Sequence, residues 1–133
     1  MTFLQPSPSS EVYPDPPQSG PPARDERKIA AALHGVTFLG VLLPLANLWS
    51  PLLLWRLHYH RSTFIDEHAK EVLNFQLNVT WWCILSIVTI GLYIGWLIMI
   101  AVLALVLFCT LKAVWTAYEG HYYRYPSIRR FLR

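Results

Sequence analysis

Charged residues are absent from a stretch of forty positions, residues 72–111. A helical stretch of this length would be roughly 60 Å long, which is enough for about two crossings of a ~30 Å hydrocarbon core. Gly91 and Gly95 lie where such a stretch must turn, although their spacing also fits a G-x-x-x-G helix-packing motif. The pattern predicts helices over about 64–90 and 96–119, which together form a fully spanning hairpin.

A second uncharged stretch covers residues 29–55 and is interrupted by Pro44 and Pro51. Proline removes a backbone donor and disturbs the preceding helical turn, so the stretch is either one kinked span or two short helices, about 29–43 and 48–60. If the two helices turn back, all eleven lysine and arginine residues lie on one side of the membrane, as the positive-inside rule prefers. We therefore expect a short, proline-broken first hairpin, with both termini in the cytoplasm.

Composition divides the chain into two parts. Residues 1–22 hold seven of the ten prolines and few apolar side chains, so we expect a disordered tail over 1–23. Residues 24–133 then form one membrane domain, whose final part, 120–133, lies at the membrane interface. The expected fold class is all-α: a polytopic protein of the bacterial cytoplasmic (inner) membrane, built from two helical hairpins.

The net charge of +3 bears on how the chain is oriented in the membrane and does not indicate a further class of function. The basic residues flank apolar segments, where they contact anionic headgroups, and they do not indicate nucleic-acid binding. The tail after residue 120 is rich in amphipathic aromatic and arginine side chains, which are typical of the headgroup layer. The residues expected to contact lipid headgroups are Tyr122, Tyr123, Arg124, Tyr125, Arg129 and Arg130.

One helical face carries polar residues from the loop into the membrane segment. We call this face the polar stripe, and its members follow one another at spacings of four, three and four: Glu67, Glu71, Asn74 and Asn78. Polar groups at this depth are costly unless they pair or face water. Asn74 and Asn78 would either bond to the first hairpin, at Asn47 or His34, or line a groove that receives a substrate or partner segment.

Candidate chemistry is sparse along the chain. His68 and Glu71 are one turn apart and could share a metal ion, but the spacing matches neither di-iron bundles nor zinc proteases. Ser86, Thr89 and Thr110 have no acid or base nearby in the sequence. We therefore expect no catalytic activity, no metal and no cofactor.

Several short stretches together resemble a known family. The sharpest is Phe64-Ile-Asp-Glu-His-Ala-Lys-Glu-Val-Leu-Asn-Phe-Gln76, supported by Pro44-Leu-Ala-Asn47 and Gly120-His-Tyr-Tyr-Arg-Tyr-Pro126. The chain resembles the bacterial small membrane proteins of unknown function that are grouped with Tic20, the chloroplast inner-envelope import component. The resemblance implies a four-helix membrane domain with both termini on one side and a role near protein translocation. It adds motif positions without assigned roles: Asp66, His68, Gln76, His34 and Asn47.

The expected function is non-enzymatic. The polar stripe would bind other membrane or translocating polypeptides, for example within a translocation-associated assembly, or would join copies of the chain into a homo-oligomer. The alternative is a small oligomeric channel or carrier whose hydrated path uses the same stripe, residues 67–78.

Overall fold

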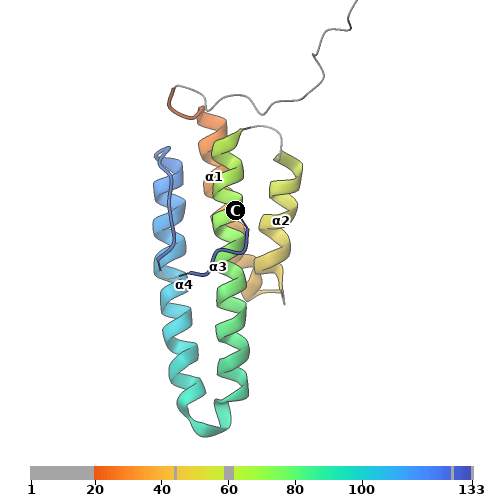
Figure 1. The fold of residues 1–133 in the computed structure, drawn as a ribbon, viewed down its shortest axis with the longest axis vertical. Coiled ribbons are helices and arrows are strands. Elements are labelled where there is room, and N and C mark those ends of the chain that lie inside the picture. The colour runs from red at the N-terminus through yellow and green to blue at the C-terminus, as the bar shows by residue number, and fades with distance from the viewer. Residues whose placement is uncertain (1–19, 44, 59–61, 127, 133) are drawn as a thin grey trace, which may run out of the picture.

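The computed structural model is an assembly of helices (Figure 1). It describes residues 20–43, 45–58, 62–126 and 128–132. The all-helical fold class is confirmed, because these residues form four α-helices and two short 3-10 helices and include no strand. The predicted disordered tail falls mainly on residues 1–19, which lie outside the described residues.

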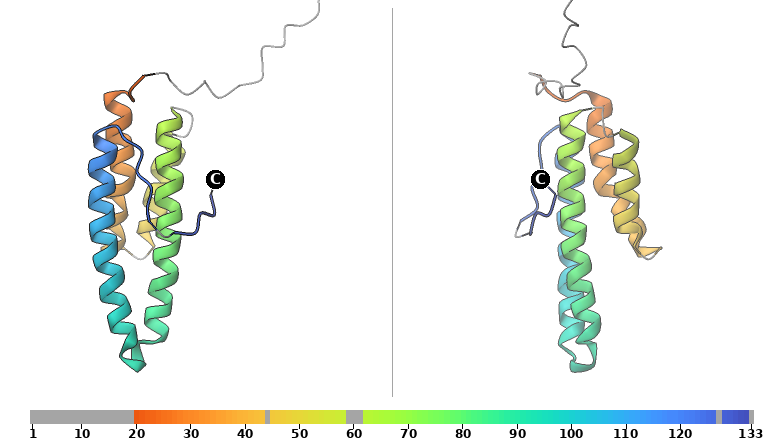
Figure 2. Two further views of the ribbon diagram at one scale, coloured as in Figure 1. Left: turned by 60° about the vertical axis from the view of Figure 1, so that its left-hand side comes forward. Right: turned by 45° about the vertical axis from the view of Figure 1, so that its right-hand side comes forward.

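The two longest helices form an antiparallel hairpin. Helix α3 spans Thr63–Val88 and helix α4 spans Ile94–Tyr118, where the sequence predicted helices over 64–90 and 96–119. The views of Figures 1 and 2 show the two helices side by side along their length. This hairpin is the longest part of the fold and sets the position of everything else.

The turn between α3 and α4 depends on Gly95. A 3-10 helix, η2 (Ile90–Leu92), bridges the two helices, and Tyr93 takes a left-handed conformation with φ 61°. The Ser86 hydroxyl donates to the Gly95 carbonyl at 2.6 Å. A Cβ at position 95 would collide with the Ser86 carbonyl oxygen and the Ile90 backbone. The absence of a side chain at Gly95 is therefore what lets the turn close.

The first half of the fold is shorter. Helix α1 (Arg24–Gly35) continues as a 3-10 helix, η1 (Val36–Val41), and helix α2 (Ala46–His58) runs back beside it. The Glu26 carboxylate accepts the Ala23 N–H at 2.8 Å, which satisfies one free amide at the start of α1. Both helices lie along the part of α3 that is distant from the α3–α4 turn (Figures 1 and 2).

The first pair differs in detail from the expected helices over 29–43 and 48–60. The first α-helix begins earlier and tightens into the 3-10 form after residue 35. The chain reverses before α2, where Leu45 has φ 62°. Pro51 is buried inside α2 rather than at a helix end, while Pro44 lies outside the described residues.

Buried side chains join the helices in three clusters. One lies between α1 and α3: Leu33, Ile65, Ala69, Val72 and Leu73. A second joins α1, α3 and α4: Ala30, Ala31, Phe64 and Ala117. A third joins α3 and α4 to the segment after α4: Phe75, Val79, Val102, Cys109, Ala113 and Tyr125. The alanines of the second cluster allow the backbones of α1 and α4 to approach closely.

The part of the α3–α4 hairpin that extends beyond the first pair is apolar on its outside. Large exposed side chains there include Trp81, Ile87, Val88, Leu92, Trp96, Leu97, Ile100, Leu103 and Phe108. An exposed apolar surface of this extent is typical of contact with lipid or protein. Within the described part of the chain, α4 alone is long and apolar enough to cross a membrane. The polar residues in the first half of α3 lower the hydropathy of that helix.

Candidate functional site

The segment after α4 returns along the bundle and meets the polar stripe of α3. We call residues 121–132 the C-terminal strap; residue 127 lies outside the described residues. Gly120 starts the strap with φ 88°, and its N–H donates to the Ala117 carbonyl at 3.0 Å. The left-handed glycine ends α4 and redirects the chain toward α3, as Figure 2 shows.

Two asparagines of the polar stripe bind the backbone of the strap. The Asn74 side-chain oxygen accepts the N–H groups of Phe131 and Leu132, both at 2.8 Å, and its amide donates to the Leu132 carbonyl at 2.9 Å. The Asn78 oxygen accepts the Arg129 N–H at 3.2 Å, and its amide donates to the Arg129 carbonyl at 2.9 Å. Both side chains thus bond to backbone N–H and carbonyl groups of the strap, as the backbone of a neighbouring β-strand would.

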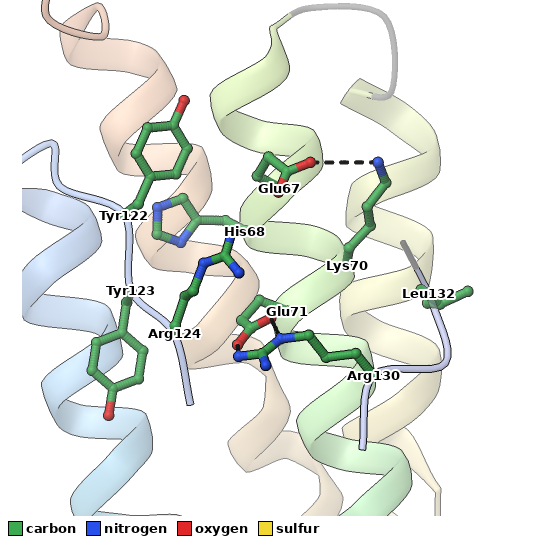
Figure 3. Close-up of a pocket in the computed structure, with 9 residues that line it drawn as sticks. All are labelled: Glu67, His68, Lys70, Glu71, Tyr122, Tyr123, Arg124, Arg130 and Leu132. Atoms are coloured by element: carbon green, nitrogen blue, oxygen red, sulfur yellow. Dashed lines mark hydrogen bonds and ion pairs between the residues drawn. The ribbon is translucent and has the colours of Figure 1, made fainter. Parts of the chain in front are cut away.

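Glu71 holds the strap through charge as well as hydrogen bonding. Its carboxylate accepts two bonds from the Arg130 guanidinium, at 2.8 and 3.1 Å, and a third from the Tyr125 N–H at 2.9 Å. The side chain of Glu71 is 10% exposed. A nearly buried carboxylate with a two-point arginine partner is a strong, geometrically selective pair. Figure 3 shows the guanidinium lying against this carboxylate.

The first hairpin does not supply the partners that the sequence indicated for Asn74 and Asn78. Asn47 instead donates to the Gln76 side-chain oxygen at 3.1 Å. His34 contacts His68 rather than an asparagine. The structure therefore joins Glu71, Asn74 and Asn78 to the strap. Of the motif positions, it pairs His34 with His68 and Asn47 with Gln76, whereas Asp66 bonds to Lys70 and Trp55.

Two histidines and one tyrosine form a buried chain. His34 Nδ1 lies 2.9 Å from the Tyr125 hydroxyl, and His34 Nε2 lies 2.9 Å from His68 Nδ1. The Tyr125 ring stacks on Phe75 with centroids 3.9 Å apart. Each histidine is at most 1% exposed, and these hydrogen bonds replace bonds to water at three of the four ring nitrogens. The fourth, His68 Nε2, is buried and has no hydrogen-bond partner among the described residues.

Burial moves the pKa values of the hydrogen-bonded histidine and tyrosine side chains further from neutral pH. His68 lies on α3 before the charge-free stretch, and burial lowers its pKa to about 4. Burial raises the pKa of the Tyr125 phenol above its ordinary value. Both groups are therefore neutral near pH 7, and they act as hydrogen-bonding groups rather than charges.

A pocket of about 570 Å³ separates the start of α3 from the strap (Figure 3). Its lining consists of Glu67, His68, Lys70, Glu71, Tyr122, Tyr123, Arg124, Arg130 and Leu132. Lys70 pairs with Asp66 at 2.6 Å and with Glu67 at 3.6 Å. The pocket thus has charges of both signs, most of them already paired across or beside it.

Glu67, at the outer end of the polar stripe, has a different environment from the other members of the stripe. Glu67 has a side chain that is 50% exposed, and its carboxylate contacts Lys70 alone among the ion pairs of the described residues. Asp66 also accepts the Trp55 indole N–H at 2.9 Å, which ties α2 to α3. Glu67 is therefore the stripe residue most open to a partner, and binding of a partner by the stripe remains a prediction.

The residues predicted at lipid headgroups have different environments. Tyr122 is exposed and stacks beside His68, and Arg124 and Arg129 are exposed. Burial raises the pKa of Tyr123 to about 12. Arg130 is engaged by Glu71, and Tyr125 is buried in the core. Headgroup contact by these residues remains a prediction, which the exposed members fit best.

Sequence reasoning missed the pairing of α3 with the strap. It placed Glu71 and Arg130 in different sites, although their opposite charges were the available signal. It also missed Lys70 and Leu132 as pocket residues, for which no spacing signal exists. Across the described ranges, no group of three or more His, Cys, Asp or Glu side chains is arranged to hold a metal ion.

Comparison with known proteins corrects the expected family. No curated protein and no solved structure matches the chain. A family profile matches residues 25–132, which cover all four α-helices and the strap. The assignment to a Tic20-like family is therefore wrong, and the link to protein import that depended on it loses its support. The short motifs that prompted it lie mostly in α3 and the strap, where they hold this fold together. The chain belongs to the magnetosome magnetite crystal formation protein family.

Proposed function

We propose that this chain is a non-enzymatic integral protein of the magnetosome membrane that acts in magnetite crystal formation by binding other proteins of that membrane. The observation that carries the proposal is the family match over residues 25–132. The match includes both the apolar hairpin and the strap, so it covers the anchoring part and the polar part of the domain. The apolar outer surface of α3 and α4 supports a position within a bilayer.

The proposed arrangement in the membrane uses the two hairpins differently. Helices α3 and α4 both cross, and α1, η1 and α2 enter only part of the thickness from the cytoplasmic side. Charged residues support this orientation because they lie near the start of α1, near the start of α3 and near the end of α4, away from the α3–α4 turn. Examples are Arg27, Lys28, Lys70 and Lys112. Both termini are then cytoplasmic.

The partner surface is the cytoplasmic end of the polar stripe together with the strap. Glu67 is half exposed and lines the pocket beside Arg124, which is exposed. The channel or carrier alternative has less support, because Asn74 and Asn78 would line its path and both use their hydrogen bonds to hold the strap.

The localisation test uses cells that form magnetosomes. A fluorescent fusion of the full chain is expected to co-purify with magnetosome membranes and to be depleted from the remaining cytoplasmic membrane. Deletion of the gene is expected to change crystal size or number, and the wild-type copy restores it. An even distribution over all membranes together with unchanged crystals would contradict the proposal.

The binding test uses a photo-crosslinking residue in living cells. The structure favours position 67 for the probe, because Asn74 is 1% exposed and already bonded to the strap. The matched control places the probe at Leu103, on the apolar outside of α4. Discrete protein adducts from position 67, absent from position 103, support partner binding, whereas no adduct at either position contradicts it.

A further inference from the structure

The strap is recognised mainly through atoms that any amino acid supplies. Asn78 binds the N–H and carbonyl of Arg129, and Asn74 binds the N–H of Phe131 and both backbone groups of Leu132. None of these bonds depends on the identity of the side chain. The face formed by Glu71, Asn74 and Asn78 therefore has the properties of a general receptor for non-helical backbone.

Within residues 128–132, side-chain contacts with the rest of the fold are concentrated at alternate positions. The Arg130 guanidinium donates two hydrogen bonds to the Glu71 carboxylate, at 2.8 and 3.1 Å. Two positions earlier, Ile128 packs against the cluster that includes Phe75, and two positions later, Leu132 packs against the cluster between α1 and α3. The site therefore selects the pattern apolar-x-Arg-x-apolar.

We propose that the face formed by Glu71, Asn74 and Asn78 is an exchangeable docking site for a non-helical segment of another polypeptide that carries this pattern. Residues 128–132 of the strap are its resident occupant, and the incoming segment displaces them while Tyr125 stays in the core. The inference rests on the proposed function, since it specifies how a partner protein binds. The incoming segment must supply an arginine, because Glu71 left nearly buried without its two-point partner is strongly destabilising.

The contacts of the strap fit exchange better than permanent closure. The bonds between Asn78 and Arg129 are exposed to solvent, and the Arg130 side chain is 37% exposed. Residues 128–132 form no helix and none of them is fully buried, so they can leave without unwinding a helix or opening the core. Segments with exposed hydrogen bonds and few buried apolar side chains open at the lowest free-energy cost in a protein.

The test measures peptide binding to the full chain in lipid nanodiscs by fluorescence anisotropy. The probes are a labelled peptide with the sequence of residues 127–133, the same peptide with Arg130→Gln, and an unrelated peptide that keeps only the apolar-x-Arg-x-apolar pattern. The chain is studied as wild type and as Arg130→Gln, which weakens the resident strap. Arg129→Gln is the matched control, since it removes one positive charge from the adjacent residue but leaves the ion pair with Glu71 intact.

The same substitution is expected to have opposite effects in the two molecules. In the chain, Arg130→Gln tightens binding of both arginine-containing peptides by roughly tenfold or more, because a competing charge-assisted pair is lost. In the peptide, it weakens binding by a similar factor. The chain variant Arg129→Gln behaves like wild type, and Glu71→Gln abolishes the preference for arginine.

Three results would overturn the proposal. One is equal peptide binding by the wild-type and Arg130→Gln chains, with circular dichroism and gel filtration showing both folded. Another is failure of the unrelated peptide to bind. A third is a photo-crosslink from position 131 of the bound peptide that maps outside residues 71–78, a measurement made on the wild-type chain and so independent of variant folding. Localisation in cells does not enter this assay, so the two proposals fail separately.

Discussion

His34 and His68 share one hydrogen bond, with His34 Nε2 2.9 Å from His68 Nδ1, although the residues are 34 positions apart. A bond between two imidazole nitrogens needs one nitrogen with a proton and one without. Two imidazolium ions would therefore lose this bond and repel each other in a site that excludes water. The contact that joins α1 to α3 is thus stable only while at least one ring is neutral.

Acidification is expected to destabilise the fold. Because burial lowers the pKa of His68 to about 4, against 6.5 when unfolded, the unfolded chain binds more protons between these values. This contribution is complete above pH 6.5 and is lost as pH falls toward 4, by at most about 3 kcal/mol. Thermal unfolding in detergent micelles at pH 7.5 and 4.5 measures the loss. His68→Asn should flatten the dependence, and His121→Asn, at an exposed residue, should leave it unchanged.

The Tyr125 hydroxyl is expected to matter more than its position in a polar tail implies. Tyr125→Phe keeps the stacking on Phe75 but leaves His34 Nδ1 without its partner, at a cost of about 1 to 3 kcal/mol. Tyr122→Phe is the matched control, because Tyr122 is 61% exposed and should change stability little. Equal midpoints for the two variants in denaturant titrations would show that the buried bond contributes nothing.

The bond between Asn47 and Gln76 predicts a double-mutant result. Asn47→Leu leaves the buried Gln76 side-chain oxygen without its donor and should cost about 1 kcal/mol or more. Adding Gln76→Leu should recover part of this loss, because both polar groups are then gone. Unfolding free energies of the wild type, both single variants and the double variant close the cycle. Strict additivity would count against a direct interaction.

The two glycines of the hairpin turn look equivalent in the sequence but have different surroundings in the structure. Gly95→Ala should cost about 2 kcal/mol or more, since its Cβ would collide with the Ser86 carbonyl and Ile90. Gly91→Ala, with no atom within 4 Å of the added Cβ, should change stability by no more than about 0.5 kcal/mol. Thermal unfolding of both variants tests the contrast, which would be refuted by similar losses at the two positions.

The membrane arrangement predicts different labelling at two exposed leucines. Leu92 at the α3–α4 turn and Leu42 at the end of the first pair are 75% and 77% exposed. In a chain with Cys83 and Cys109 replaced by serine, a cysteine at position 92 should react with a membrane-impermeant thiol reagent from the face opposite the cytoplasm. A cysteine at position 42 should react from neither face. Reaction at both positions from the same face would mean that the first pair also crosses.

The helices were more predictable than the site. The α3–α4 hairpin follows from the lack of charge over residues 72–111, because this stretch is long enough for two apolar helices with a turn between them. The first pair was harder, since Pro51 breaks a helix by rule yet is buried inside α2. Pro51 lacks the N–H that would bond to the Asn47 carbonyl. The neighbouring Ser50 hydroxyl bonds to the Val36 carbonyl of η1 as well as to Ala46, which holds this part of α2 against the first helix pair.

The strap escaped prediction for a physical reason. Asn74 and Asn78 recognise backbone atoms, and a backbone partner leaves no pattern in the sequence. Tyr125 belongs to the same short aromatic run as Tyr122. Only the three-dimensional path of the strap shows that the Tyr125 ring is buried and the Tyr122 ring is exposed. The Tic20-like assignment rested on short polar motifs such as residues 64–76, whereas the family profile that matches residues 25–132 is that of the magnetosome family.

The separation between the strap and its receptor sets an order of events during synthesis. Asn78 and Asn74 bond to residues that are 51 to 58 positions further along the chain. At about 5 to 20 residues per second, a ribosome needs roughly 3 to 12 s to produce them. During that interval the carboxylate of Glu71 and the amides of Asn74 and Asn78 are without the partners that they have in the fold. The contacts between α3 and the strap therefore form only after α4 has been translated, so helix formation and completion of the site are separate steps in time.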